Sequence, residues 1–237
     1  MSTYVLVHGA WHGGWCWERM RQRLIQSGAR LYTPTLTGLG ERAHLLSPSV
    51  SLETHVADVL QVLEEPALSD VILVGHSYAG MVITAVADRL PQRLARLVYL
   101  DAIVPRSGQC LLDCASPEFR SRIDEQVKAR GDGWRIPIPA PESLGLLQQA
   151  DIDWVMPKLV PHPYRSFCEA VHFRSRDAYK VPRTYINCIG NKPRGGPRSQ
   201  QSAGIEDYHE LSSGHDAMVT APLELATLLS SFGQVPG

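Results

Sequence analysis

The sequence predicts an α/β fold built on a mostly parallel sheet with helices on both faces. One observation is the alternation of strand-like and helix-like segments, which is typical of right-handed βαβ units. A second is that the strand-like segments are continuous apolar runs such as Val71–Val74, as expected for strands buried on both faces. The length of 237 residues fits a single domain, 1–237.

The stretch with the clearest chemical meaning runs from a strand at Asp70–Gly75 into a helix at Ala79–Leu90, with Ser77 at the apex. A sharp strand-to-helix turn with serine at its tip matches the nucleophile elbow. Such a turn is strained, and it needs small residues on either side of the serine, a condition that Gly75 and Ala79 meet. The helix N-terminus would also stabilise an oxyanion at the apex. The alternative is an ordinary Gly–Ser turn.

The N-terminal part of the chain supplies the elements that precede this turn. Thr3–Val7 is a buried strand, and Cys16–Gln26 is a helix closed by Gly28. Arg30–Pro34 is a second strand. The segment from Ser51 to Pro66 has apolar residues at helical spacing and is expected to form the next helix.

The C-terminal part contains three further strands and a final helix. Leu97–Ala102 is a fourth strand that ends on a carboxylate, Arg183–Ile189 is a fifth and Tyr208–Leu211 a sixth. Pro222 starts the last helix. Between 103 and 180 the alternation breaks down into prolines, short helical pieces and aromatic residues. We expect this region to form a cap over a core made of 1–102 and 181–237.

A glycine-rich loop follows the first strand, at His8–Trp15. Parallel sheets hold ligands at such places, and glycines let the backbone approach a substrate closely. In hydrolases with a nucleophile elbow this loop supplies an oxyanion-hole N–H, here that of Ala10, together with the N–H of Tyr78. His8 and His12 are expected to shape the loop by hydrogen bonds, the alternative being that one of them is a catalytic base.

Composition excludes several classes of function. The net charge of −1 leaves no basic surface for nucleic acid or an anionic membrane. The longest apolar runs are too short to span a bilayer, and no signal peptide is visible, so a cytoplasmic location is expected. The 5 cysteines match no zinc or redox spacing. We expect no metal and no organic cofactor.

Three motifs, His8–Trp17, Val74–Tyr78 and Gly214–Met218, together resemble the α/β-hydrolases. Within that family the chain resembles the plant methyl esterases and hydroxynitrile lyases and their bacterial relatives, from Thr3 to about Leu229. The resemblance implies a six-stranded sheet with a helical cap and a homodimer. It also implies Ser77 as nucleophile, His215 as base, and the N–H groups of Ala10 and Tyr78 as oxyanion hole.

The sequence departs from the family pattern at two positions. The plant lyases have a lysine directly after the catalytic histidine, where this chain has Asp216, which disfavours lyase chemistry. The plant enzymes take the triad aspartate from the loop after the fifth strand, where this chain has Asn191. An asparagine cannot supply the negative charge that stabilises an imidazolium.

Asp101 is the carboxylate that we expect to complete the triad. It follows the fourth strand, which neighbours the strand of the elbow in this fold, so it stands on the same edge of the sheet as Ser77. Asp216 directly follows His215, so its carboxylate would have to fold back to reach the His215 ring. Glu206, Asp207 and Glu210 lie before or within the sixth strand. The alternative is that Asp101 only caps the next turn.

These assignments predict a serine esterase for a small or medium carboxylic ester, a methyl ester among the candidates, through an acyl-enzyme. The aromatic side chains of Trp11 and Trp134 are the expected substrate-binding groups. Two other classes stay open. One is a C–C lyase on the same scaffold. The other is a non-catalytic small-molecule binder, which the asparagine at Asn191 motivates.

Overall fold

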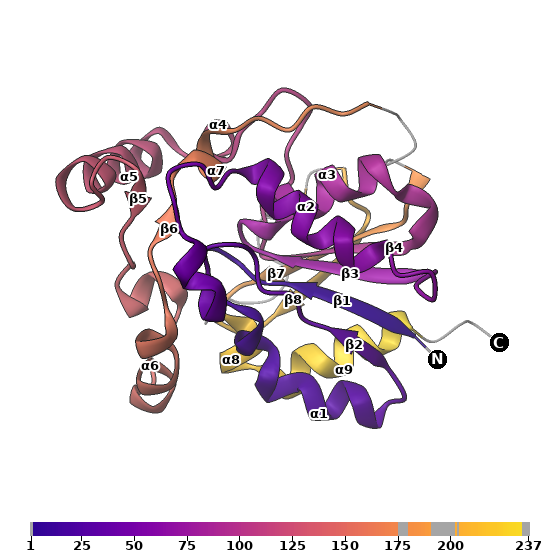
Figure 1. The fold of residues 1–237 in the computed structure, drawn as a ribbon. Helices are drawn as coiled ribbons and strands as arrows, with labels where there is room; N and C mark the ends of the chain where they lie inside the picture. Colours follow the sequence, from indigo (N-terminus) through magenta and orange to yellow (C-terminus); the bar gives the residue numbers. More distant parts are fainter. Residues whose placement is uncertain (1, 175–179, 191–201, 203, 234–237) are drawn as a thin grey trace.

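A six-stranded sheet forms the centre of the computed structural model, which describes residues 2–174, 180–190, 202 and 204–233 (Figure 1). The strand order is β2-β1-β3-β4-β7-β8, and every pairing is parallel. The strands are β1 (Thr3–Val7), β2 (Arg30–Tyr32), β3 (Val71–His76), β4 (Leu94–Leu100), β7 (Arg183–Cys188) and β8 (Asp207–Leu211). The predicted fold class is confirmed.

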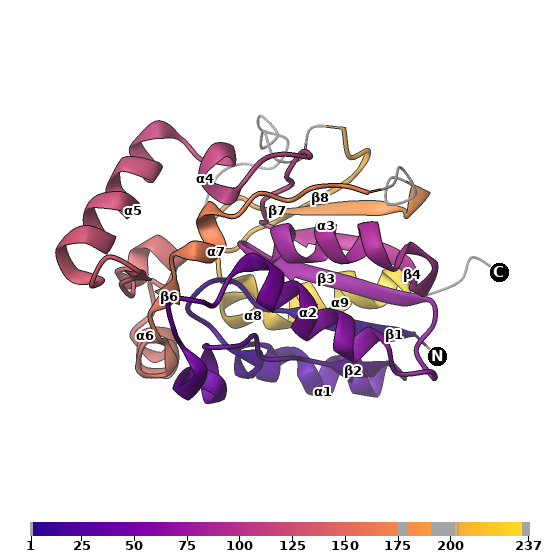
Figure 2. The same cartoon turned by 45° about the horizontal axis from the view of Figure 1, so that its top comes forward.

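Helices cover both faces of this sheet (Figures 1 and 2). The helices on one face are α1 (Glu18–Gln26), α8 (Ala217–Thr220) and α9 (Pro222–Phe232), and those on the other are α2 (Leu52–Leu63) and α3 (Ala79–Arg89). Alternate residues of each strand enter the two cores, as the period of a strand requires. Val5 and Val7 of β1 pack with α2 and α3, and Tyr4 and Leu6 pack with α1 and α9.

The described residues between β4 and β7, which we call the cap, lie beyond the carboxyl ends of the strands (Figures 1 and 2). The described part of the cap contains a short antiparallel pair, β5 with β6, and four α-helices, besides 3-10 turns. Its elements are α4 (Leu111–Cys114), α5 (Pro117–Arg130), β5 (Arg135–Ile136), α6 (Gln149–Val155), β6 (His162–Pro163) and α7 (Arg165–Cys168). The cap therefore stands over the edge of the sheet where the sequence predicts a reactive site.

Some element bounds differ from the sequence prediction. The helix expected from Cys16 begins as a 3-10 turn at Gly14–Trp17, and α1 proper starts at Glu18. The strand β4 starts at Leu94, because it pairs with the beginning of β3 across an irregularity of register. It stops at Leu100, because Asp101 has a positive φ of 44° that leaves the extended conformation.

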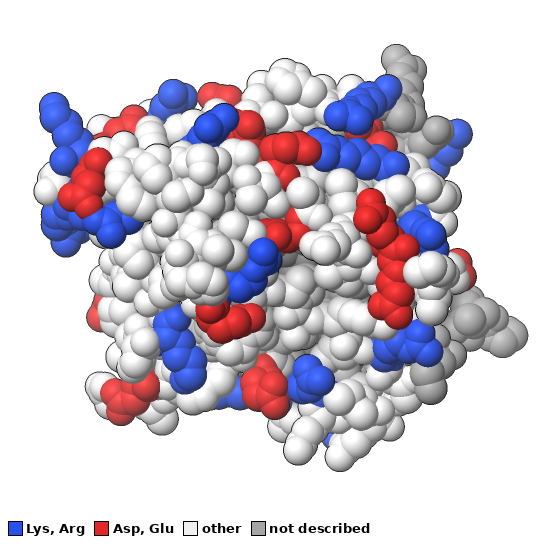
Figure 3. Space-filling view, in the orientation of Figure 1, with Lys and Arg blue, Asp and Glu red and all other residues white. Residues whose placement is uncertain are grey.

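Acidic and basic side chains are interspersed over the face seen in Figure 3, without a continuous patch of one sign. Within the described residues, every helix is too short or too polar to traverse a bilayer.

Candidate active site

Ser77 occupies a tight turn between β3 and α3. Its φ is +55°, which is unusual for a residue other than glycine. Two backbone hydrogen bonds to the segment after β3 and α3 hold the turn. The Ser77 N–H donates to the Leu100 carbonyl, and the Ser77 carbonyl accepts from the Ile103 N–H, both at 3.1 Å. A Cβ at Gly75 would lie 2.8 Å from the Ala79 carbonyl oxygen, so a larger residue there would push the turn apart. This is the strained geometry that the sequence predicts.

A chain of hydrogen bonds connects Ser77, His215 and Asp101. The His215 Nε2 lies 2.9 Å from the Ser77 Oγ, and its Nδ1 lies 2.6 Å from the Asp101 Oδ2. His215 is in the loop after β8, and Asp101 directly follows β4, the neighbour of β3 in the sheet. A carboxylate on Nδ1 selects the tautomer whose Nε2 can accept the serine proton. Asn191 lies outside the described residues.

The environment favours the protonated form of His215. Burial by itself would lower the pKa of His215, but the hydrogen bond and charge of Asp101 outweigh it, and the charge of Asp216 adds to them. The net effect raises the pKa of His215 above its ordinary value. An imidazole of raised pKa next to a serine hydroxyl has the properties of a general base.

Ala10 and Tyr78, the residues whose N–H groups are expected to supply the oxyanion hole, line the same cavity as Ser77. Neither N–H has a hydrogen-bond acceptor among the described residues. The peptide that carries the Ala10 N–H is fixed at its other end, because the His8 Nδ1 donates to the Gly9 carbonyl at 2.8 Å. The His8 Nε2 accepts from the Leu36 N–H, and burial lowers the pKa of His8 to about 3, so His8 is neutral. Two free donors beside a serine can bind an oxyanion.

A cavity of about 760 Å³ opens over Ser77 and extends beneath the cap. Its wall contains the expected groups Ala10, Trp11, Ser77, Tyr78, Asp101 and His215. The cap contributes mainly apolar and aromatic side chains, together with a few polar ones. These cap residues include Leu111, Phe119, Arg122, Ile123, Gln126, Arg130, Ile138, Leu144 and Phe167. No group of three or more His, Cys, Asp or Glu among the described residues is arranged to hold a metal ion.

Trp11 connects the glycine-rich loop to the cap. Its N–H donates to the Nδ1 of His162 at 3.4 Å, its indole N–H donates to the Ile136 carbonyl at 3.3 Å, and its carbonyl accepts from Val160 at 3.1 Å. The backbone φ of Trp11 is +66°. These cap contacts hold the strained loop and place the indole in the cavity wall.

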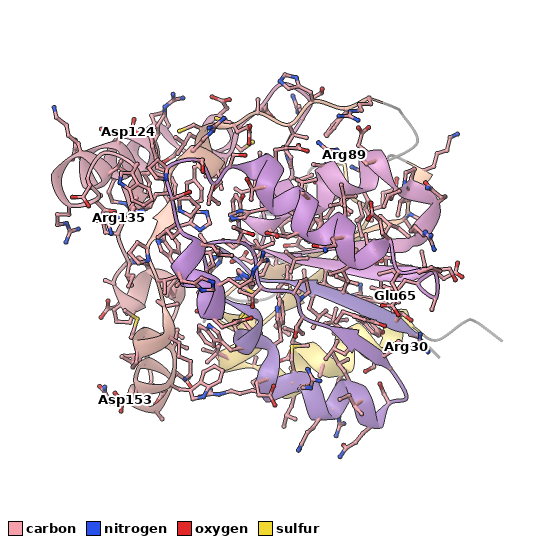
Figure 4. All side chains as sticks on the ribbon, viewed as in Figure 1. Arg30, Glu65, Arg89, Asp124, Arg135 and Asp153 are labelled. Atoms are coloured by element: carbon pink, nitrogen blue, oxygen red, sulfur yellow. The ribbon has the colours of Figure 1, made fainter. Side chains whose placement is uncertain are left out.

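The structure does not place Trp134, the other expected substrate-binding residue, at the cavity. The guanidinium of Arg135, labelled on the cap in Figure 4, lies 5.1 Å from the centre of the Trp134 ring. The Trp134 carbonyl accepts from Tyr164 at 2.9 Å. Trp134 directly precedes β5, so the direction of its ring depends on how the backbone enters the β5–β6 pair. An aromatic-rich composition does not predict that direction. Phe119 and Phe167 line the cavity instead.

A fully buried ion pair lies behind the triad. The His12 Nε2 is 3.0 Å from the Asp216 Oδ2, with side-chain exposures of 1% and 0%. The His12 Nδ1 faces the Ala10 carbonyl at 2.7 Å, so both ring nitrogens point at acceptors and both carry protons. Burial opposes this charge, but Asp216 outweighs it and raises the pKa of His12, and His12 in turn lowers the pKa of Asp216. Asp216 therefore pairs with His12 and not with His215.

His76 lies beside this ion pair and connects the elbow to the loop that carries His215. It directly precedes Ser77, and its Nε2 donates to the His215 carbonyl at 2.9 Å. Burial, together with the charge of His215, lowers the pKa of His76 well below its ordinary value, so the ring is neutral. The buried cluster of His12, His76 and Asp216 thus connects the glycine-rich loop, the elbow and the His215 loop. Sequence reasoning missed this cluster, because its members contact one another only in the folded chain.

Breaking the ion pair from one side is expected to destabilise the protein strongly. Asp216→Asn should lower the free energy of unfolding by about 3–5 kcal/mol, because it leaves a buried group without its partner. The double variant Asp216→Asn/His12→Gln should lose less than the sum of the two single variants. Urea unfolding of the four proteins measures both quantities. Strict additivity would contradict the pairing.

Comparison with known proteins agrees with this geometry. The model of the alpha/beta hydrolase family matches residues 4–228, and the chain belongs to that family. The chain is 38% identical to the carbendazim hydrolyzing esterase of a Nocardioides strain, over 98% of this chain and 100% of that protein. It is 27% identical to the putative chloroplastic methylesterase 14 of Arabidopsis thaliana, over 100% of this chain and 73% of that protein.

Among solved structures, an extracellular α/β-hydrolase from a Paenibacillus species matches with a TM-score of 0.87 and 25% identity. The match covers 99% of this chain and 100% of that chain. That protein is described as sharing structural and functional homology with tobacco salicylic acid binding protein 2. Family and relatives together make this protein a carboxylic ester hydrolase of the methylesterase-like group. The predicted esterase activity is thereby confirmed.

Proposed function

We propose that this esterase works through an acyl-enzyme on Ser77, with His215 as base and Asp101 as the acid of the triad. The observation that carries the proposal is the unbroken hydrogen-bond chain from the Ser77 Oγ through His215 to Asp101 at the base of a cavity. It supports Asp101 in the role of the acid missing at Asn191, and it therefore argues against a non-catalytic binder. The position after His215, where a lyase has a lysine for its leaving group, holds the carboxylate of Asp216, which is buried against His12.

The reaction follows from the positions of these groups. His215 takes the Ser77 proton while the Oγ attacks the ester carbonyl carbon, and the negative charge moves to the carbonyl oxygen. The N–H groups of Ala10 and Tyr78 bind that oxyanion. His215 then donates its proton to the departing alkoxide, which leaves as an alcohol. Water repeats the sequence on the acyl-enzyme and releases the acid.

The expected substrate is a small or medium ester with an apolar body. A volume of about 760 Å³ accommodates a molecule of drug size, and aromatic rings such as Phe119 and Phe167 supply the contact surface. Trp11 follows Ala10 in the oxyanion loop and its ring meets that of Phe167, so it is suited to contact the group next to the ester. The names of the relatives add methyl esters and carbendazim as compounds to test.

A substrate panel tests the proposed function. We expect the purified chain to hydrolyse some members of a panel of acyl and alkyl esters that includes methyl esters of aromatic acids and carbendazim. Rates are compared between the wild type and Ser77→Ala. Turnover that is equal in both proteins, or absent from the wild type over the whole panel, would contradict the proposal.

The pH dependence should identify His215 as the base. Only the neutral imidazole accepts the serine proton, so kcat/KM is expected to rise with pH as His215 deprotonates. Because the pKa of His215 is raised, this limb should lie above the ordinary imidazole value of about 6.5. A profile of kcat/KM against pH measures it. His215→Ala should lose the limb together with the activity, and a limb that survived in that variant would reject the assignment.

We also propose a cytoplasmic enzyme that acts as a homodimer. The compartment rests on the cysteines Cys16, Cys110, Cys114, Cys168 and Cys188, which are all free thiols, as is usual in a reducing environment. The dimer rests on the family resemblance. Cell fractionation and light scattering of the purified chain test the two statements separately. A secreted protein, or a monomer at all concentrations, would contradict them.

A further inference from the structure

One face of α5 forms a wall of the cavity above Ser77. The residues that line it are Phe119, Arg122, Ile123, Gln126 and Arg130. Their spacing follows the period of a helix, so they lie on a single side of α5. In Figure 2 this helix runs along the outer part of the cap. The cavity wall therefore combines apolar side chains such as Phe167 and Leu144 with two exposed arginines, Arg122 and Arg130, on α5.

These two arginines supply positive charge to the cavity wall, and no carboxylate in that wall balances it. The only carboxylate among the lining residues is Asp101, and its Oδ2 is hydrogen-bonded to His215. Within the described part of the chain, neither Arg122 nor Arg130 has an ion pair with an acidic residue. The Arg122 guanidinium lies 5.2 Å from the centre of the Phe119 ring, which restricts its orientation.

Two other charged groups of α5, Arg120 and Asp124, behave differently. Arg120 forms an ion pair with Asp113 at 3.3 Å and does not line the cavity. Asp124, labelled on the cap in Figure 4, accepts a hydrogen bond from the Tyr164 hydroxyl. Arg120 and Asp124 are therefore engaged with partners away from the cavity, whereas Arg122 and Arg130 are exposed on the cavity wall without an acidic partner among the described residues.

We infer that Arg122 and Arg130 bind a carboxylate at the end of the substrate remote from the ester. The inference rests on the proposed function and specifies its substrate class as esters that carry a distal carboxylate, such as half-esters of dicarboxylic acids. A guanidinium offers paired N–H donors that match the two oxygens of a carboxylate. The apolar lining residues would hold the carbon chain between the two ends.

A ladder of paired substrates tests this inference. Monomethyl esters of dicarboxylic acids from adipate to azelate are compared with methyl alkanoates of the same chain length, by methanol release. We expect the wild type to favour the anionic ester by about twofold to fivefold in kcat/KM at one chain length, the size expected of an accessible ion pair. The preference should weaken at high salt, because ions screen it.

The variants Arg122→Gln and Arg130→Gln should each lower the ratio of anionic to neutral kcat/KM. Arg120→Gln is the matched control, since it removes a cation of the same helix outside the cavity and should leave the ratio unchanged. A ratio in the wild type that stays flat at every chain length would overturn the inference, as would an equal loss in all three variants. Failure of the proposed function is distinct, because the wild type would then hydrolyse neither series.

Discussion

Replacing Ser77 by alanine is expected to remove nearly all ester turnover while leaving the fold intact. The substitution deletes only the hydroxyl group. The turn keeps its backbone hydrogen bonds to Leu100 and Ile103, because these do not involve the side chain. When the nucleophile of such a unit is lost, kcat falls on the order of 10⁶. Steady-state kinetics on the best ester of the panel, with circular dichroism as a check of the fold, measures this effect.

The matched control is Ser49→Ala, because Ser49 is an exposed serine that does not line the cavity. It should retain the wild-type kcat. If Ser77→Ala kept a tenth of the wild-type kcat in a clean preparation, water would be attacking the ester directly and the acyl-enzyme route would be excluded.

Asp101→Asn is expected to lower kcat by about 10⁴ with little change in stability, the effect seen when a triad carboxylate becomes an amide. The asparagine has the same shape, but it can turn an N–H toward the Nδ1 of His215. It would then favour the tautomer whose Nε2 carries a proton and cannot accept another. Single-turnover kinetics separate this loss in the chemical step from any change in binding.

The control for this variant is Asn191→Ala, at the place where the plant pattern has its acid. We expect it to cost far less than Asp101→Asn. Near-wild-type kcat in Asp101→Asn would mean that the acid is supplied from elsewhere or that Ser77 and His215 act as a dyad.

Local sequence and the rules of parallel sheets account for a large part of the site. The elbow could be predicted because its strain lies within a few residues around Ser77, and strain requires small neighbours such as Gly75. Asp101 could be placed beside His215 because β3 and β4 are adjacent in the sheet, and adjacent parallel strands bring their carboxyl ends to one edge. Neither argument needs to know where a distant side chain points.

The side chains of the cap that line the cavity could not be predicted in this way. The sequence indicates its extent and its aromatic composition, yet Trp134 is absent from the cavity wall and Phe167 is part of it. The lining face of α5 combines Arg122 and Arg130 with apolar residues, so no clean apolar stripe marks it in the sequence. Which way each cap side chain points depends on packing between short elements, and short elements have weak periodicity of their own.

By itself, the sequence determined the class of fold, the elbow at Ser77, the glycine-rich loop around Ala10 and the family to which these motifs belong. Only the tertiary structure decided the distances in the contact of Asp101 with His215, which the sequence had only indicated, the pairing of Asp216 with His12 and the composition of the cavity wall. The physical reason is the range of the interactions. Backbone strain and strand periodicity act between near neighbours, whereas ion pairs and cavity walls join residues that the chain brings together only when it folds.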